Sequence, residues 1–74
     1  MMYDYSKLCG KIREKFVTQE AFANGLGISS TTLSNKLNNK VQWSQEEMWK
    51  AVELFGEPVA KIPAYFFTEK VQFN

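Results

Sequence analysis

The sequence predicts an all-α protein, built as a compact helical bundle of four main helices plus a short C-terminal helical segment. Apolar residues recur at helical spacing along most of the chain, and residues that favour helix ends separate these stretches. The 74 residues suffice for one small hydrophobic core, so we expect residues 1–74 to form a single domain.

The first predicted helix ends near Phe16 or Val17, and Asp4 or Ser6 can cap its start. The charged residues of this segment are expected to face solvent. Its apolar residues follow the spacing of one helical stripe, and they are Tyr5, Leu8, Cys9, Ile12 and Phe16.

Two short helices are predicted next, at about residues 19–26 and 30–38. Thr18 and Ser29 precede them and offer N-cap oxygens to their free backbone amides. Gly27 directly follows the first of these helices, at a position where a left-handed backbone favours glycine. The pattern therefore describes two helices joined by a tight turn.

The second of these helices is too polar to lie inside a core. Leu33 and Leu37 are its only strongly apolar residues, so we expect it to contact the core along one line. Asn35 and Lys36 then lie on its outer part. A polar helix that follows a tight turn is suited to reading the edges of DNA bases.

The fourth predicted helix runs from Gln45 to about Phe55. Ser44 with Glu47 three residues later forms a capping box at its start, and Gly56 ends it. This helix should complete the core with its apolar side.

The C-terminal segment, residues 57–74, is expected to close the core and to contribute to a dimer. Two prolines favour a turn near residues 58–61 and a final helical segment at about 63–67. The segment carries more aromatic side chains than a small core readily hides. We therefore expect Tyr65, Phe66 and Phe67 to be divided between the core and an interface with a second subunit.

The composition excludes several classes of function. One cysteine and no histidine exclude disulfide frameworks, zinc fingers and histidine-based catalysis, and no glycine-rich phosphate loop is present. We expect no enzyme activity, no metal and no cofactor. The absence of a signal peptide and of a long apolar run predicts a cytoplasmic protein with no membrane contact, associated with the nucleoid when bound to DNA.

The distribution of charge is more informative than the net charge of +1. Residues 21–45 contain Lys36 and Lys40 but no carboxylate, and this window includes the two short helices. Such a surface does not repel phosphate. A merely polar, solvated surface would show the same pattern, so charge alone does not decide between the two interpretations.

The chain resembles the phage Cro/CI-type repressors, whose DNA-binding domain is a lambda-repressor-like helix-turn-helix. The resemblance covers residues 8–55, and the first and last segments are similar to small Cro-like regulators from phages and prophages of Gram-positive bacteria. The residues that carry it are Thr18-Gln19-Glu20, Ala23, Leu26-Gly27-Ile28-Ser29 and Thr32-Leu33-Ser34, with Ile62-Pro63-Ala64-Tyr65-Phe66-Phe67 for the subgroup.

The resemblance implies that the helix at about 30–38 lies in the major groove with its first half toward the bases. Its exposed residues are then candidates for base contacts, and Asn35 can bond adenine through both atoms of its amide. These candidates are Ser30, Thr31, Ser34 and Asn35. For the serines and threonine at the start of the helix, simple capping is the structural alternative.

The resemblance also implies a set of phosphate contacts. Gln19 opens a helix whose free amides attract an anion, and Ser29 combines capping with a second role at a phosphate. The residues that flank the second helix are expected to hold the opposite strand, and they are Lys36, Asn38, Asn39 and Lys40.

These residues together predict a sequence-specific repressor of transcription that binds double-stranded operator DNA in a phage or prophage switch. Without a separate oligomerisation region, we expect it to bind as a homodimer, and a competing repressor can share the operator. The alternative is a helix-turn-helix fold used as a protein-interaction module of the antirepressor or antitoxin type. Acidic residues in the segment 30–38 would favour that alternative, and the segment has none.

Overall fold

The structure, a computed structural model, describes residues 2–71 and is all-α over this range. Its only other regular feature there is an isolated antiparallel bridge between Tyr3 and Glu69, which joins the two ends of the chain. The fold class predicted from the sequence is confirmed. In chain order the elements are α1 (Ser6–Phe16), α2 (Gln19–Leu26), α3 (Ser30–Leu37), α4 (Gln45–Phe55), the 3-10 helix η1 (Val59–Lys61) and α5 (Ile62–Phe66).

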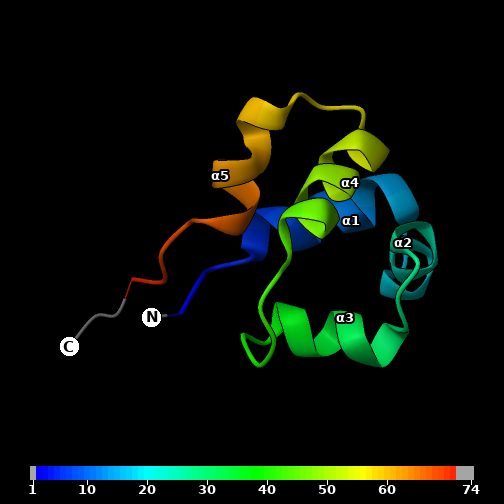
Figure 1. The fold of residues 1–74 in the computed structure, drawn as a ribbon, viewed down its shortest axis with the longest axis horizontal. Coiled ribbons are helices and arrows are strands. Elements are labelled where there is room, and N and C mark those ends of the chain that lie inside the picture. Colours follow the sequence, from blue (N-terminus) through cyan, green and yellow to red (C-terminus); the bar gives the residue numbers. More distant parts are fainter. Residues whose placement is uncertain (1, 72–74) are drawn as a thin grey trace.

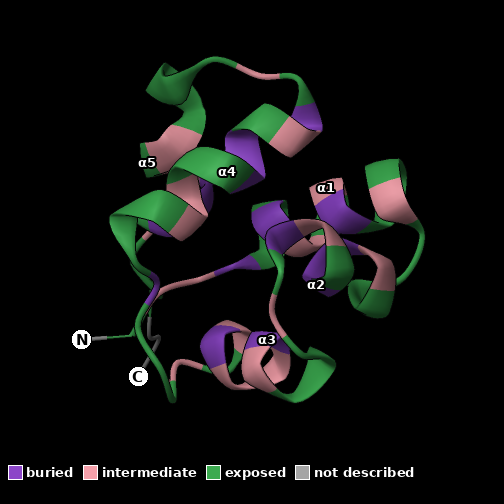
Figure 2. Ribbon diagram, turned by 45° about the vertical axis from the view of Figure 1, so that its right-hand side comes forward, coloured by how far each residue is buried: buried purple, intermediate pink, exposed green. Residues whose placement is uncertain are grey.

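Helix α3 lies to one side of the other helices, as Figure 1 shows, and connects to them through the α2–α3 turn and the α3–α4 loop. Its buried residues are on the side that faces the rest of the molecule, while its opposite side is intermediate or exposed (Figure 2). The core between the helices includes a stacked pair, Phe22 and Phe55, with ring centroids 5.3 Å apart. The largest fully buried side chains are Phe22, Phe66, Leu8, Ile12, Leu33 and Val52.

The helix ends agree with the predicted caps. Thr18 Oγ1 accepts a hydrogen bond from the backbone N–H of Ala21 at the start of α2. Gly27 has a φ of 79° after α2, and Gly56 has a φ of 71° after α4, both in the left-handed region that favours glycine. Local residues thus determine where α2 and α4 begin and end.

The capping box of α4 is complete. Ser44 Oγ accepts from the backbone N–H of Glu47, and Glu47 Oε1 accepts from the backbone N–H of Ser44 at 2.8 Å. At the start of α1 the cap is different from the one predicted, because Tyr5 occupies the N-cap position. The carboxylate of Asp4 instead accepts from the backbone N–H of Ser6 at 2.8 Å.

The C-terminal segment closes the core, and its three consecutive aromatic residues are divided between buried and exposed positions. Tyr65 and Phe66 are buried, and the Phe66 ring lies 4.9 Å from the ring of Trp43 between centroids. The Tyr65 hydroxyl donates to Glu57 Oε2 at 2.6 Å. Because both side chains fill the monomer, Phe67, which is 49% exposed, is the only one of the three predicted interface residues that remains accessible. The interface with a second subunit stays a prediction. Residues 72–74 of the predicted segment lie outside the described residues.

Candidate recognition surface

The outward side of α3 presents a row of short polar side chains. Thr31, Ser34, Asn35 and Asn38 are spaced so that they share one side of the helix, opposite the buried Leu33. Thr31 and Asn38 are exposed, and Ser34 and Asn35 are partly exposed. We call these four residues, together with the exposed Ser30 in the first turn, the α3 face. Four of the five are the predicted base-contact residues.

The polar groups of the α3 face differ in how far they are already satisfied. Asn38 Nδ2 donates to the backbone carbonyl of Ser34 at 2.8 Å, so this amide closes the end of the helix. The side chains of Ser30, Thr31 and Asn35 make no hydrogen bond to any part of residues 2–71. Their donors and acceptors therefore remain open to a partner, and they are the strongest candidates for direct contact.

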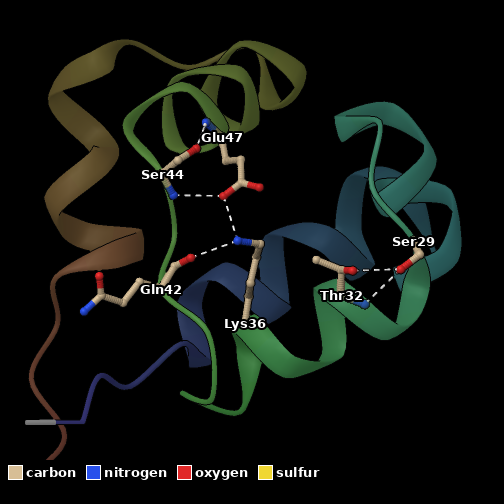
Figure 3. A network of polar contacts seen from close by, with 6 residues as sticks. All are labelled: Ser29, Thr32, Lys36, Gln42, Ser44 and Glu47. Carbon is tan, nitrogen blue, oxygen red and sulfur yellow. Dashed lines mark hydrogen bonds and ion pairs between the residues drawn. The ribbon is translucent and has the colours of Figure 1, made fainter.

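Ser29 caps α3, as predicted. Its hydroxyl oxygen accepts from the backbone N–H of Thr32 at 3.1 Å and donates to Thr32 Oγ1 at 2.9 Å (Figure 3). Thr32 is thus part of the cap, a role that was not predicted for it from the sequence. Gln19 is exposed at the first residue of α2, where backbone amides have no helical partner. The phosphate contacts predicted for Ser29 and Gln19 stay predictions.

Lys36 lies inside the protein, and this placement corrects the phosphate contact predicted for it. The residue is 5% exposed, and its Nζ lies 2.9 Å from Glu47 Oε1. The same ammonium donates to the backbone carbonyl of Gln42 at 2.8 Å. Figure 3 shows the side chain pointing from α3 toward the start of α4, away from the α3 face. The lysine joins two elements and neutralises a carboxylate, so its ammonium is not on the surface where a phosphate would reach it.

The partner carboxylate carries its charge in spite of its partial burial. Burial raises the pKa of Glu47. The hydrogen bond from the backbone N–H of Ser44 and the ion pair with Lys36 together lower this pKa by more than burial raises it, so it lies below the usual value. The aromatic ring of Trp43 also lies near the ammonium, with 5.7 Å between Nζ and the ring centroid. Each charge in this cluster therefore has a compensating group.

Asn39, which is partly buried, uses its amide to hold the N-terminal segment, and the phosphate contact predicted for it stays a prediction. Its amide oxygen accepts from the backbone N–H of Tyr3 at 2.9 Å, and its amide nitrogen donates to the Tyr3 carbonyl at 3.0 Å. The side chain thus pairs with the N-terminal segment as a neighbouring strand would. Lys40 is exposed, and it is the one basic side chain of residues 21–45 that remains on the surface.

A sequence signal for the burial of Lys36 was present. Lys36 is three residues after Leu33 and directly before Leu37, so it lies on the flank of the line that contacts the core. No comparable signal marks Asn39, because its partner Tyr3 is 36 residues away in the sequence.

Residues 2–71 contain neither a membrane-spanning helix nor a cluster of metal ligands. None of the helices there is long and apolar enough to span a membrane. The same residues hold no group of three or more side chains that could coordinate a metal ion.

Comparison with known proteins places the chain in a family. The family model described as "Protein of unknown function (DUF739)" matches residues 1–69. The chain is also similar to the solution structure of the modulator of repression (MOR) of the temperate bacteriophage TP901-1 from Lactococcus lactis. The two share 50% sequence identity with a TM-score of 0.78, and the similarity covers 97% of each chain. No curated protein matches the chain.

Proposed function

The chain belongs to the DUF739 family, and we propose that it modulates repression in the genetic switch of a temperate phage by binding the repressor protein of that switch. The α3 face forms part of the contact surface in this proposal. The similarity to a phage modulator of repression over almost the whole chain supports the regulatory role. The proposal is the protein-interaction interpretation of the sequence, of the antirepressor type.

The observation that carries the protein contact is the burial of Lys36. Proteins that bind DNA neutralise several phosphates with Lys and Arg side chains, and this term supplies much of their affinity. Residues 21–45 contain two lysines. Lys36 forms an ion pair with Glu47, and Lys40 alone is exposed. The surface around α3 is therefore nearly neutral, which suits a protein partner better than a phosphate backbone.

Direct binding to operator DNA is the second candidate, and the open polar groups of Thr31 and Asn35 favour it. In this case Ser30, Thr31, Ser34 and Asn35 contact bases, while Gln19, Ser29, Asn38 and Lys40 contact phosphates. A homodimer that reads two half-sites would then use the exposed Phe67. A neutral helix can read bases, provided that phosphate contacts come from elsewhere.

A pair of titrations separates the two candidates. The chain is titrated with the purified repressor of the same phage, and with duplexes that carry the operator or a scrambled sequence at two salt concentrations. We expect saturable binding to the repressor and equally weak binding to both duplexes. Asn35→Ala removes an unpartnered amide and should weaken repressor binding about fivefold, the value of one neutral hydrogen bond.

Gln45→Ala is the matched control, because Gln45 is an exposed amide side chain on α4 and not on the α3 face. It should leave the affinity unchanged. A chain that ignores the repressor but prefers operator over scrambled DNA would overturn the protein contact and establish the second candidate.

A further inference from the structure

The residue that joins α1 to α2 has an unfavourable backbone conformation. Val17 has a φ of 70° and a ψ of −50°, and the backbone N–H of Thr18 donates to the carbonyl of Phe16 at 2.7 Å. These dihedral angles and this i to i+2 hydrogen bond define a γ-turn of the rare, strained type. Glycine, asparagine and aspartate adopt left-handed backbone far more readily than a β-branched residue does.

The fold gains nothing from the valine side chain that would offset this strain. Val17 is 76% exposed, the highest value among the large apolar side chains of residues 2–71. It belongs neither to the buried core nor to the apolar residues packed against it. Asn39, the other non-glycine residue with a positive φ, differs because its side chain makes two hydrogen bonds to Tyr3.

We propose that Val17 is a contact residue, which inserts its two methyl groups into an apolar pocket on the repressor protein. This inference rests on the proposed function and extends its contact surface from the α3 face to the α1–α2 turn. A strained backbone conformation that no contact within the fold compensates is typical of binding sites. The valine side chain then contributes to the stability of the complex and not to that of the free protein.

The surroundings of Val17 fit a protein partner. Exposed charged residues of both signs lie within four positions of it, and they are Arg13, Glu14, Lys15 and Glu20. Glu14 is also paired with Lys11 at 3.0 Å, so this rim has no marked net charge. An apolar centre with a charged rim is the common arrangement of a protein–protein contact.

Two substitutions separate a binding role from a structural one. Val17→Thr keeps the β-branched shape and the strain but replaces one methyl group with a hydroxyl group. It should leave the melting temperature unchanged and weaken binding to the repressor about tenfold. Val17→Gly removes the strain as well as the side chain. It should raise the melting temperature by about 4 °C while weakening repressor binding at least as much.

Val71→Thr is the control, since Val71 is also largely exposed but lies at the other end of the chain, outside the turn. Its repressor affinity should equal that of the wild type. The wild type and the three variants are compared by calorimetric titration with the same purified repressor and by thermal unfolding. Repressor binding that is unchanged in both Val17 variants would overturn this inference and leave the proposed function intact. A wild type that fails to bind the repressor would overturn the proposed function itself.

Discussion

The two ends of α3 are held in different ways. At its start, Ser29 caps the helix through Thr32, and the turn from α2 closes with a hydrogen bond from the Ile28 N–H to the Ala23 carbonyl at 3.0 Å. All these contacts join residues that are close in the sequence. At its end, Lys36 reaches Glu47 of the next helix, and Asn39 reaches Tyr3 at the N-terminus.

This difference decides which end can be inferred from the sequence. Caps and left-handed turns follow rules that relate residues three to five positions apart, so the start of α3 was predictable. The contacts at its end depend on where distant segments arrive in space. The difference also predicts unequal losses of stability at the two ends, because breaking a buried charged contact costs more free energy than removing an exposed cap.

The largest effect is expected from breaking the ion pair at the end of α3. Lys36→Met keeps most of the side-chain volume but leaves the Glu47 carboxylate without its ammonium partner. We expect the free energy of unfolding to fall by about 3 kcal/mol, the cost of removing one partner from a buried pair. Urea denaturation of the variant measures this loss.

The double variant Lys36→Met/Glu47→Gln serves as the control for this prediction. Without the charge on residue 47, the buried methionine no longer faces an unpaired carboxylate, and much of the lost stability should return. A single variant as stable as the wild type would show that the two ends of α3 do not differ as we describe.

A smaller loss is expected at Asn39. Asn39→Ala removes two hydrogen bonds to Tyr3 and places alanine at a φ of 63°, so unfolding should become easier by about 2 kcal/mol. Asn39→Gly loses the same hydrogen bonds but tolerates the backbone, and it should recover about 1 kcal/mol of that loss. Equal stability of the two variants, measured by thermal unfolding, would mean that the hydrogen bonds alone account for the effect.

The start of α3 should be less sensitive. Ser29→Ala removes the cap at an exposed helix end, and the expected loss is about 1 kcal/mol. Ser29→Asp supplies another capping oxygen and should retain most of the stability. A loss for Ser29→Ala that equalled the loss for Lys36→Met would remove the distinction between local and distant support.

Most of the fold could be predicted from the sequence, because helix periodicity and capping are local properties. Even the bounds of α2 and the position of Gly27 agree with the expectation. The contacts that were not predicted involve polar residues on the surface of a predicted helix or loop. Lysine and asparagine are usually solvated, and sequence periodicity does not reveal that Lys36 and Asn39 have partners elsewhere.

The candidate site was predictable only in part for the same reason. The exposed positions of Thr31 and Asn35 follow from the apolar line through Leu33, which places them on the opposite side of the helix. The electrostatic character of the site does not follow from it. Counting Lys36 as a surface charge overstated the affinity for phosphate, since its charge is balanced by Glu47 inside the protein.

The smallest predicted effect is a dependence of stability on acid pH that arises at the end of α3 and not at its start. The pKa of Glu47 in the folded protein lies below its ordinary value of 4.5, so the charged carboxylate stabilises the fold above that pH. This contribution should disappear as the pH falls through the lower pKa of the folded state. In Glu47→Gln the decline should be smaller than in the wild type, because the contribution of this carboxylate is missing. Ser29→Ala should keep the full decline, because the start of α3 contains no titrating group. Urea denaturation of these proteins at a series of pH values between about 2 and 6 follows the titration range of a carboxyl group. If Glu47→Gln lost stability over this range as the wild type does, the carboxylate that gives acid sensitivity would lie elsewhere, and Glu57, whose pKa is lowered by its hydrogen bonds from Tyr65 and Lys11, is the next candidate.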